Sequence, residues 1–370
     1  MDILLITPYF GGSHRAWAEG YAQNSRHHIT RLALPARFWK WRMQGGALTL
    51  AKQAEQRNLH ADLLLTTDML NLPVFLALTR HRFHATPIAL YCHENQLTYP
   101  LQDGEKRDLT YPMINWLSML AADHVFFNSR YHMENWFKAL PRMLKHFPDY
   151  AHTPHIPEIR AKSSVLPVGC ALAELDNVRP ITSSESKAPL ILWNQRWEYD
   201  KAPHIFFQAL DVLAAEGLAF EVALAGSNER QQPEEFQAAR ERLGERVIHF
   251  GRADKTTYRR LLWQADIVVS TAIHEFFGIA VVEAAYCNTF PILPNRLAYC
   301  EVFPEMHHDD CLYDDFAGLL TRLHWALTHQ KDARQKATAL RKTLAQYDWG
   351  NIAKQYDKEI DKALHQKYTV

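Results

Sequence analysis

Two glutamates, Glu275 and Glu283, lie eight positions apart in the stretch AIHEFFGIAVVEAAYC, residues 272–287. The pattern predicts a buried strand that ends before His274 and a helix that begins near Gly278. The start of a helix has unpaired backbone N–H groups and a partial positive charge, so it can bind a phosphate. Carboxylates beside it can accept hydrogen bonds from sugar hydroxyls. The stretch is therefore a candidate nucleotide-sugar site, although Glu283 could instead pair with an arginine in a structural role.

Gly278 suits the same interpretation, because a residue without a side chain lets a ligand approach the backbone closely. A second candidate is the pair Arg196 and Lys201, which lie five positions apart in LWNQRWEYDKAP, residues 192–203. A planar guanidinium and a compact ammonium group together suit a diphosphate. The alternative is that both are ordinary surface cations.

Two polar segments follow predicted strands in the first half of the chain. In YFGGSH, residues 9–14, two successive glycines would let the backbone pass close to a ligand. The segment lacks the G-x-G-x-x-G spacing, so it does not indicate a dinucleotide site. In YCHENQ, residues 91–96, His93 and Glu94 follow a strand. They could cap a turn, or one of them could contact a reacting sugar.

The segment RFWKWR, residues 37–42, alternates cations with aromatic residues. Cations bind phosphates and aromatic rings stack on unpaired bases, which is how proteins bind single-stranded loops of RNA. The alternative is that the tryptophans are in the core and the cations extend outward to solvent. The candidate RNA-binding residues are Arg37, Trp39, Lys40, Trp41 and Arg42.

These residues must be positioned by the elements between them, and short apolar runs alternate with helical patterns throughout the chain. Such runs are typical of parallel strands buried on both faces. They lie at 2–10, 61–68, 87–95, 123–129, 190–195, 220–228, 246–252, 266–273 and 290–294. Helices are expected at 16–25, 108–122, 202–216, 233–243, 255–264, 278–287, 314–345 and 349–367.

The pattern predicts two α/β domains joined by a linker at 174–189, which is rich in proline, serine and charge. The expected domains are residues 1–175 and 189–346, followed by a C-terminal helix at 347–370. In open parallel sheets, ligands bind beyond the carboxyl ends of the strands. The polar residues that close the strands should therefore line a cleft between the domains.

Composition excludes several classes of protein. Lys plus Arg and Asp plus Glu number 41 each, whereas a non-specific nucleic-acid binder is usually basic. The five cysteines are irregularly spaced and form no C-x-x-C pair, so a disulfide framework or zinc site is not indicated. The N-terminus does not have the pattern of a signal peptide, and no apolar run approaches the length of a membrane span. We expect a cytoplasmic protein that does not bind membranes.

The quoted segments, with HENQLTYP (93–100), RDLTYPMINWLSMLAADHVFFNS (107–129) and STAIHEFFG (270–278), resemble one family over nearly the whole chain. It is the tRNA-queuosine alpha-mannosyltransferase family, within the retaining GT-B glycosyltransferases marked by E-x7-E. The resemblance implies an α/β GT-B fold. Two Rossmann-like parallel-sheet domains would face each other across a cleft, and the C-terminal helix would pack back on the N-terminal domain.

The resemblance also implies a reaction. Mannose would pass from GDP-mannose, with retained configuration, to a cyclopentene hydroxyl of queuosine at the tRNA wobble position. The expected partners are the nucleotide sugar and a queuosine-containing tRNA, taken to be tRNA-Asp. We expect no cofactor and no metal, because no D-x-D follows a strand and the run 307–310 (HHDD) is expected in a loop. The alternative is a related transferase with another sugar nucleotide and a lipid or glycan acceptor. A non-enzymatic RNA-binding module would not need the charged set described above.

Roles for individual residues follow from the resemblance alone. Arg196 and Lys201 would neutralise the leaving diphosphate, and His93 would approach the transferred sugar. Glu275 would hold the sugar and distal phosphate together with the amides that follow it. Those four side chains are the expected catalytic residues. Glu283 would hold the ribose, and the base would lie around HFGR, residues 249–252. The expected donor-binding set is Gly11, Gly12, Gly226, Phe250, Gly251, Phe276, Phe277, Gly278, Ile279 and Glu283.

Overall fold

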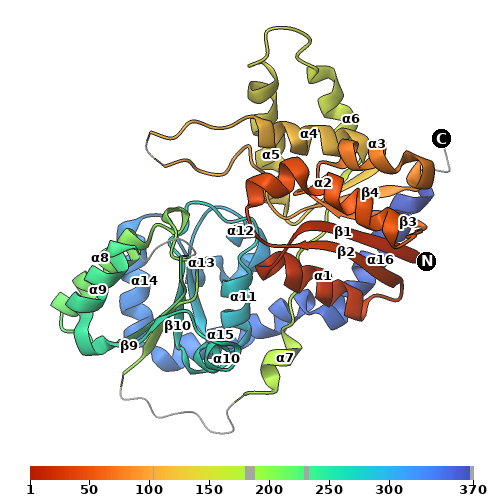
Figure 1. Cartoon of the computed structure of the whole chain (residues 1–370). Helices are drawn as coiled ribbons and strands as arrows, with labels where there is room; N and C mark the ends of the chain where they lie inside the picture. The colour runs from red at the N-terminus through yellow and green to blue at the C-terminus, as the bar shows by residue number, and fades with distance from the viewer. Residues whose placement is uncertain (103, 180–187, 229–232, 367–370) are drawn as a thin grey trace. The chain divides into compact units, whose positions relative to one another are not determined.

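The computed structural model describes residues 1–102, 104–179, 188–228 and 233–366 (Figure 1). The chain forms two compact units. The first contains Met1–Cys170 together with the segment that begins at Trp349, and the second contains Ala171–Asp348. We call them the N-terminal unit and the C-terminal unit.

The N-terminal unit is built on a six-stranded parallel sheet with the strand order β2-β1-β3-β4-β5-β6. Every residue of β3 and β4 is buried, which explains why these strands read as continuous apolar runs. The strands are β1 (Asp2–Phe10), β2 (His28–Pro35), β3 (Leu63–Thr67), β4 (Ile88–Cys92), β5 (His124–Phe127) and β6 (Ser163–Val165).

Helices cover both faces of this sheet (Figure 1). α1 (Gly12–Asn24) and α16 (Trp349–Gln366) contact each other on one face, and α2 (Trp39–Gln56), α3 (Leu72–Phe83) and α4 (Thr110–Ala121) pack side by side on the other. The chain between β5 and β6 forms α5 (Arg130–Leu144), η1 (Thr153–His155) and α6 (Ile156–Ala161).

The last helix packs on the N-terminal unit, as the sequence predicted. Trp349, its first residue, fills a space that two glycines leave open. A Cβ atom at Gly20 would lie 2.0 Å from Trp349 Nε1, and one at Gly169 would lie 2.6 Å from the same ring. Tyr21 Oη also donates a hydrogen bond of 2.9 Å to Asp357 of α16. Shape and hydrogen bonding therefore fix α16 against α1.

The C-terminal unit contains a second six-stranded parallel sheet, with the order β12-β11-β10-β7-β8-β9. α8 packs with α9 and α14, and α11 packs with α10 and α15. The strands are β7 (Leu190–Trp193), β8 (Glu221–Ala225), β9 (Val247–Gly251), β10 (Ile267–Val269), β11 (Phe290–Pro294) and β12 (Leu312–Tyr313).

The main helices of this unit are α8 (Pro203–Ala215), α9 (Glu234–Leu243), α10 (Lys255–Gln264), α11 (Ile279–Tyr286), α14 (Phe316–Thr328) and α15 (Gln330–Leu344). Its short helical segments are α7 (Ala173–Asp176), η2 (Tyr199–Lys201), η3 (Gly244–Arg246), α12 (Tyr299–Val302), η4 (Glu305–His307), α13 (His308–Cys311) and η5 (Ala345–Tyr347).

Several sequence predictions about these elements were wrong. β2, β6 and β12 were missed, because β2 is a partly exposed edge strand and the other two are very short. The helix expected at 314–345 is two helices separated at His329. The start of the expected linker is the packed helix α7, in which Asp176 accepts a hydrogen bond from Tyr286. Residues 180–187 of that linker lie outside the described residues.

Within the described part of the chain, no helix combines the length and apolar character needed to cross a bilayer.

Candidate active site

Lys201 lies at the centre of a buried charged cluster in the C-terminal unit. Its Nζ donates to the carbonyl of His274 (2.8 Å) and to Glu275 Oε2 (3.2 Å), and it lies 3.1 Å from Asp200 Oδ2. Burial by itself would lower the pKa of Lys201, but the carboxylates of Glu275 and Asp200 outweigh burial and raise it. Lys201 therefore stays charged although only 7% of its side chain is exposed.

Two neighbouring strands bring this cluster together. β7 and β10 are paired in the sheet, so the loops that follow them start side by side. Thr271 Oγ1 then donates to the Lys201 carbonyl (2.8 Å), and Ile273 N donates to the Asp200 carbonyl (2.9 Å). Ala202, which follows, has a left-handed backbone with φ of 45°. Such strain in a residue other than glycine is typical of functional sites.

Glu275 uses its second oxygen to hold the loop before α11. Its Oε1 accepts hydrogen bonds from the amides of Phe276 (3.1 Å) and Phe277 (3.3 Å). Burial would raise the pKa of Glu275, but the Lys201 charge and the Phe277 amide overcome it and lower the pKa. The amides of Phe276 and Phe277, which we expect to bind the donor, are thus hydrogen-bonded to the Glu275 carboxylate in this structure.

The helix start itself remains suited to an anion. Within the described part of the chain, the amides of Gly278, Ile279 and Ala280 donate no hydrogen bond. They are the first N–H groups of α11, where the helix dipole favours negative charge.

Gly278 is required for structural reasons that the sequence did not reveal. Its φ is +92°, and a Cβ atom there would lie 2.8 Å from the Tyr299 ring. Glycine is required at position 226 for a similar reason, because a Cβ atom there would lie 2.2 Å from the Gln195 carbonyl oxygen. Neither glycine needs a bound ligand to explain it.

Glu283 lies on α11 and is hydrogen-bonded to a residue that sequence analysis missed. Tyr258 Oη donates to Glu283 Oε2 (2.7 Å), and Asn194 Nδ2 lies within hydrogen-bonding distance of both Tyr258 Oη (3.3 Å) and the Ala280 carbonyl (2.7 Å). Burial raises the pKa of Glu283 to about 6, against the opposing effects of Tyr258 and Arg259. The arrangement is a set of donors and acceptors suited to hydroxyl groups. The arginine partner considered as an alternative contributes only at longer range.

Arg196 lies in different surroundings from Lys201. Its side chain is 58% exposed and pairs with Glu198, 3.2 Å away. The predicted Arg196–Lys201 pair is therefore one surface cation and one buried cation. Arg196 contributes charge near the cluster, since it acts on the pKa values of both Lys201 and His274.

Phe250 and Gly251 end β9, and Gly226 N donates to the Gly251 carbonyl (3.1 Å). The Phe250 ring is already covered by Arg240, whose guanidinium lies 4.7 Å from the ring centroid, and it packs against Trp197. Gly251 has a positive φ of 111° and no atom within 4 Å of a Cβ position. Gly251 therefore lies beside open space.

His93 belongs to the N-terminal unit, where it follows β4. Its backbone is fixed on both sides: its amide donates to Asp68 Oδ1 (2.9 Å), and its carbonyl accepts from Asn128 Nδ2 (2.8 Å). Burial, followed by the nearby His14 and His132, lowers the pKa of His93 well below its usual value. Asp68 and Asn128 were missed, although each directly follows a strand of the same sheet.

Gly11 lies between β1 and α1, and Gly12 is the first residue of α1. A Cβ atom at Gly11 would lie 2.4 Å from Ala36 Cβ, which explains the absence of a side chain there. Gly12 has a φ of +50° and open space around it, as a residue near a ligand would.

The segment 37–42 presents two of its aromatic rings to solvent. Phe38 is 79% exposed and Trp41 is 62% exposed, so the interpretation that places the tryptophans in the core is wrong for Trp41. Trp39 is partly buried and packs on Tyr111, with ring centroids 5.0 Å apart. Lys40 Nζ lies 5.7 Å from the Trp39 ring. Arg37 is exposed, and Arg42 donates to the Pro35 carbonyl.

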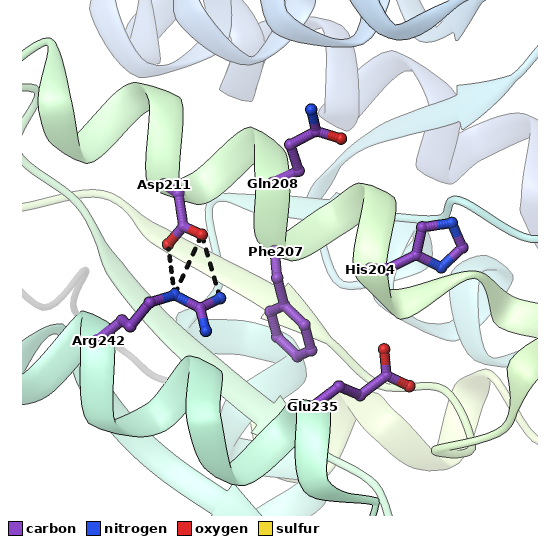
Figure 2. A pocket seen from close by; sticks show the side chains of 6 residues that line it. All are labelled: His204, Phe207, Gln208, Asp211, Glu235 and Arg242. Atoms are coloured by element: carbon purple, nitrogen blue, oxygen red, sulfur yellow. Dashed lines mark hydrogen bonds and ion pairs between the residues drawn. The ribbon is translucent and has the colours of Figure 1, made fainter.

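A separate pocket lies between α8 and α9 (Figure 2). It is lined by His204, Phe207, Gln208, Asp211, Glu235 and Arg242, none of which was predicted to bind a ligand. Arg242 and Asp211 are joined by hydrogen bonds of 3.1–3.4 Å.

The prediction that residues 307–310 form a loop was wrong, since they span η4 and α13. Among the residues that the structure describes, no group of three or more His, Cys, Asp and Glu side chains could hold a metal ion.

Comparison with known proteins identifies the family. Residues 2–170 match the family described as tRNA-queuosine alpha-mannosyltransferase N-terminal, and residues 176–336 match Glycosyl transferases group 1. The tRNA-queuosine alpha-mannosyltransferase of Drosophila melanogaster is 33% identical over 330 residues, which cover 87% of this chain and 86% of the fly protein. The chain belongs to the tRNA-queuosine alpha-mannosyltransferase family. It is a hexosyltransferase.

Solved structures at lower identity agree with this family in fold. HepE of Anabaena, in complex with UDP-glucose, is 16% identical, with a TM-score of 0.69, covering 98% of this chain and all of the other. The catalytic domain of starch synthase IV from Arabidopsis thaliana, bound to ADP and acarbose, is 12% identical, with a TM-score of 0.73 and 99% of each chain covered. The predicted GT-B class of this family member is thus confirmed.

Proposed function

We propose that this enzyme transfers mannose from GDP-mannose to a cyclopentene hydroxyl of queuosine in tRNA. The observation that carries the proposal is the pair of sites at the carboxyl end of the C-terminal sheet. One contains Lys201 and Glu275, and the other contains Glu283 with Tyr258. The helix α11 connects the two sites, and its first backbone amides have no hydrogen-bond partner among the described residues.

The nucleotide would bind across these two sites. Ionised Glu283 accepts hydrogen bonds from the ribose hydroxyls, with Tyr258 holding its carboxylate in place and Asn194 in contact with Tyr258. The diphosphate lies at the start of α11, within reach of the Lys201 charge. Lys201 has three N–H donors and three oxygen partners, so a phosphate oxygen would have to replace one of the carboxylates. Glu275, once released, accepts hydrogen bonds from the sugar.

The chemical step follows from this placement. As the glycosidic bond breaks, positive charge grows on the sugar ring and negative charge grows on the diphosphate. One fixed donor aimed at such developing charge stabilises a transition state by about 2.7–4 kcal/mol. Lys201, Arg196 and the α11 amides would all act on the leaving phosphate. We propose front-face transfer with retained configuration, in which that phosphate takes the proton of the acceptor hydroxyl and no metal takes part.

The tRNA would be bound through the N-terminal unit. Exposed Phe38 and Trp41 can stack on bases of the anticodon loop, and the cations beside them can contact its phosphates. His93 would lie near the transferred sugar. A queuosine-containing tRNA-Asp is the proposed acceptor.

The test is a transfer assay with queuosine-containing tRNA and a panel of nucleotide sugars, followed by mass analysis of the nucleosides. Queuosine should gain one hexose with GDP-mannose and none with GDP-glucose or UDP-galactose. Absence of any gain with every donor overturns the proposal. Transfer to a lipid or glycan acceptor instead would favour the alternative transferase.

A further inference from the structure

Two histidines of the N-terminal unit lie close to one another. His14 lies in the first turn of α1 and His93 follows β4, and their ring centroids are 4.2 Å apart. Each ring has a buried nitrogen that finds no hydrogen-bond partner among the residues that the structure describes, Nδ1 in His14 and Nε2 in His93. Buried polar atoms in native proteins are nearly always paired. These two nitrogens therefore indicate that a ligand supplies the missing partners.

The chemistry of the rings restricts the class of ligand. His14 is only 8% exposed, and burial lowers its pKa to about 4; burial also lowers the pKa of His93 well below its usual value. Both rings are therefore neutral at physiological pH, and each has one N–H donor and one lone pair. A hydroxyl group can donate and accept, so it can satisfy either nitrogen. An ionised phosphate only accepts hydrogen bonds, so it could pair with an imidazole N–H but not with an imidazole lone pair.

The pair is held rigidly, as a recognition site must be. Trp17 packs edge-on against the His93 ring at 4.8 Å, Tyr91 packs at 4.9 Å, and Tyr9 packs edge-on against His14 at 5.7 Å. The two hydrogen bonds to its backbone fix His93 further. A site fixed before binding loses little entropy when the ligand arrives.

We propose that His14, together with His93, hydrogen-bonds hydroxyl groups of the transferred hexose. His14 thereby becomes a sugar-recognition residue contributed by the first turn of α1. This assignment rests on the proposed function, because it needs a hexose donor to be bound.

The test pairs one substitution with changes in the donor. The wild-type enzyme and His14→Phe are assayed with GDP-mannose and with its monodeoxy analogues, each lacking one sugar hydroxyl. Phenylalanine keeps an aromatic ring against His93 but cannot form the hydrogen bond. We expect the wild type to lose about tenfold in kcat/KM on the analogue that lacks the hydroxyl bound by His14. His14→Phe should lose a similar factor on GDP-mannose and nothing further on that analogue.

A second variant separates hydrogen bonding from packing. In His14→Asn the side-chain amide reaches nearly to the position of Nδ1, so this variant should recover part of the discrimination that His14→Phe loses. GDP, which lacks the transferred hexose, should bind both variants with the wild-type Kd.

The outcomes distinguish two failures. If wild-type enzyme transfers no hexose from any donor, the proposed function fails. If it transfers mannose and His14→Phe reduces kcat/KM by the same factor for every donor, His14 has only a structural role and this inference is wrong.

Discussion

At the scale of single residues, Lys201 and Arg196 show how one sequence motif can occupy two environments. Lys201 is buried against Asp200 and Glu275, whereas Arg196 lies in solvent beside Glu198. The spacing predicted that both are cations of one site, but spacing has no information about burial. Burial depends on the loop after β10, which folds over Lys201 through Thr271 and Ile273.

Substitution of the two cations should therefore have different effects on stability. Lys201→Ala leaves two buried carboxylates without their cation and should lower the free energy of unfolding by about 3 kcal/mol. Arg196→Ala removes an exposed pair and should change it by less than about 0.5 kcal/mol. Both should reduce transfer. Urea denaturation measures the first effect, and equal losses of stability would show that the burial of Lys201 is misassigned.

Glu283 should make both stability and nucleotide binding depend on pH. Its pKa is about 6 in the folded protein, against a usual value of 4.5. Between these values the folded state keeps a proton that the unfolded state has lost, so raising the pH through this window destabilises the fold, by at most about 2 kcal/mol. Glu283→Gln should remove this dependence.

Nucleotide binding should show the opposite trend, because the ribose hydroxyls need the ionised carboxylate. The Kd for GDP should therefore rise as the pH falls below about 6. Calorimetry from pH 5 to pH 8 measures it, with Glu283→Gln as the control. Glu283→Gln should bind GDP weakly at every pH. If the Kd of the wild type is also independent of pH, protonation of Glu283 does not control binding.

At the scale of elements, apolar runs located the buried strands well, because a parallel strand with helices on both faces leaves few polar positions. The same rule did not locate the strands at the edges of the sheets. In β2 only Leu32 and Leu34 are buried, and β6 has only three residues, none fully buried. The partners Tyr258 and Asn194 could not be assigned from sequence, since only the packing of α10 beside α11 brings Tyr258 to Glu283.

The C-terminal helix should affect catalysis as well as stability. Tyr356 of α16 is fully buried; its Oη accepts from Trp17 Nε1 (3.0 Å) and lies 3.0 Å from Tyr91 Oη. Trp17 and Tyr91 both pack on His93. The helix therefore supports the position of His93 through these two rings.

Tyr356→Phe and Tyr21→Phe form a matched pair for this prediction. Each removes one buried hydroxyl between α1 and α16, because Tyr21 Oη donates to Asp357. Each should lower the free energy of unfolding by about 1 kcal/mol. Only Tyr356→Phe should lower kcat with the KM for GDP-mannose unchanged. Equal kcat values in the two variants would mean that α16 stabilises the unit without positioning His93.

At the scale of the whole molecule, the organisation into two parallel sheets was predictable from the sequence in outline. Two series of strands predicted two parallel sheets, and the E-x7-E and R-x4-K motifs fell in the second series. The net charge of zero gave no indication of the proposed RNA site, because that site consists of a few residues at the start of α2 and just before it. The core and surface interpretations of residues 37–42 could be separated only by the structure, since the same alternation suits both.

Substitutions in the proposed RNA site should affect tRNA binding and protein stability independently. The Trp41 ring lies against the helix at Gly45, where a Cβ atom would be 3.0 Å away, and most of the side chain is exposed. Trp41→Ala should weaken tRNA binding about tenfold by removing one stacking surface, with no change in melting temperature. Trp39→Ala should lower the melting temperature, because Trp39 packs on Tyr111. A fall in melting temperature for Trp41→Ala without any loss of tRNA affinity would contradict the RNA site.

The most direct test of the central claim is a crystal structure of the protein with bound GDP-mannose. We predict density for the ribose at Glu283 and Tyr258, and for the diphosphate between Lys201 and the first amides of α11. Density for the nucleotide in the pocket between α8 and α9, or anywhere else that leaves Lys201 and Glu283 without contact, would contradict the account (Figure 2).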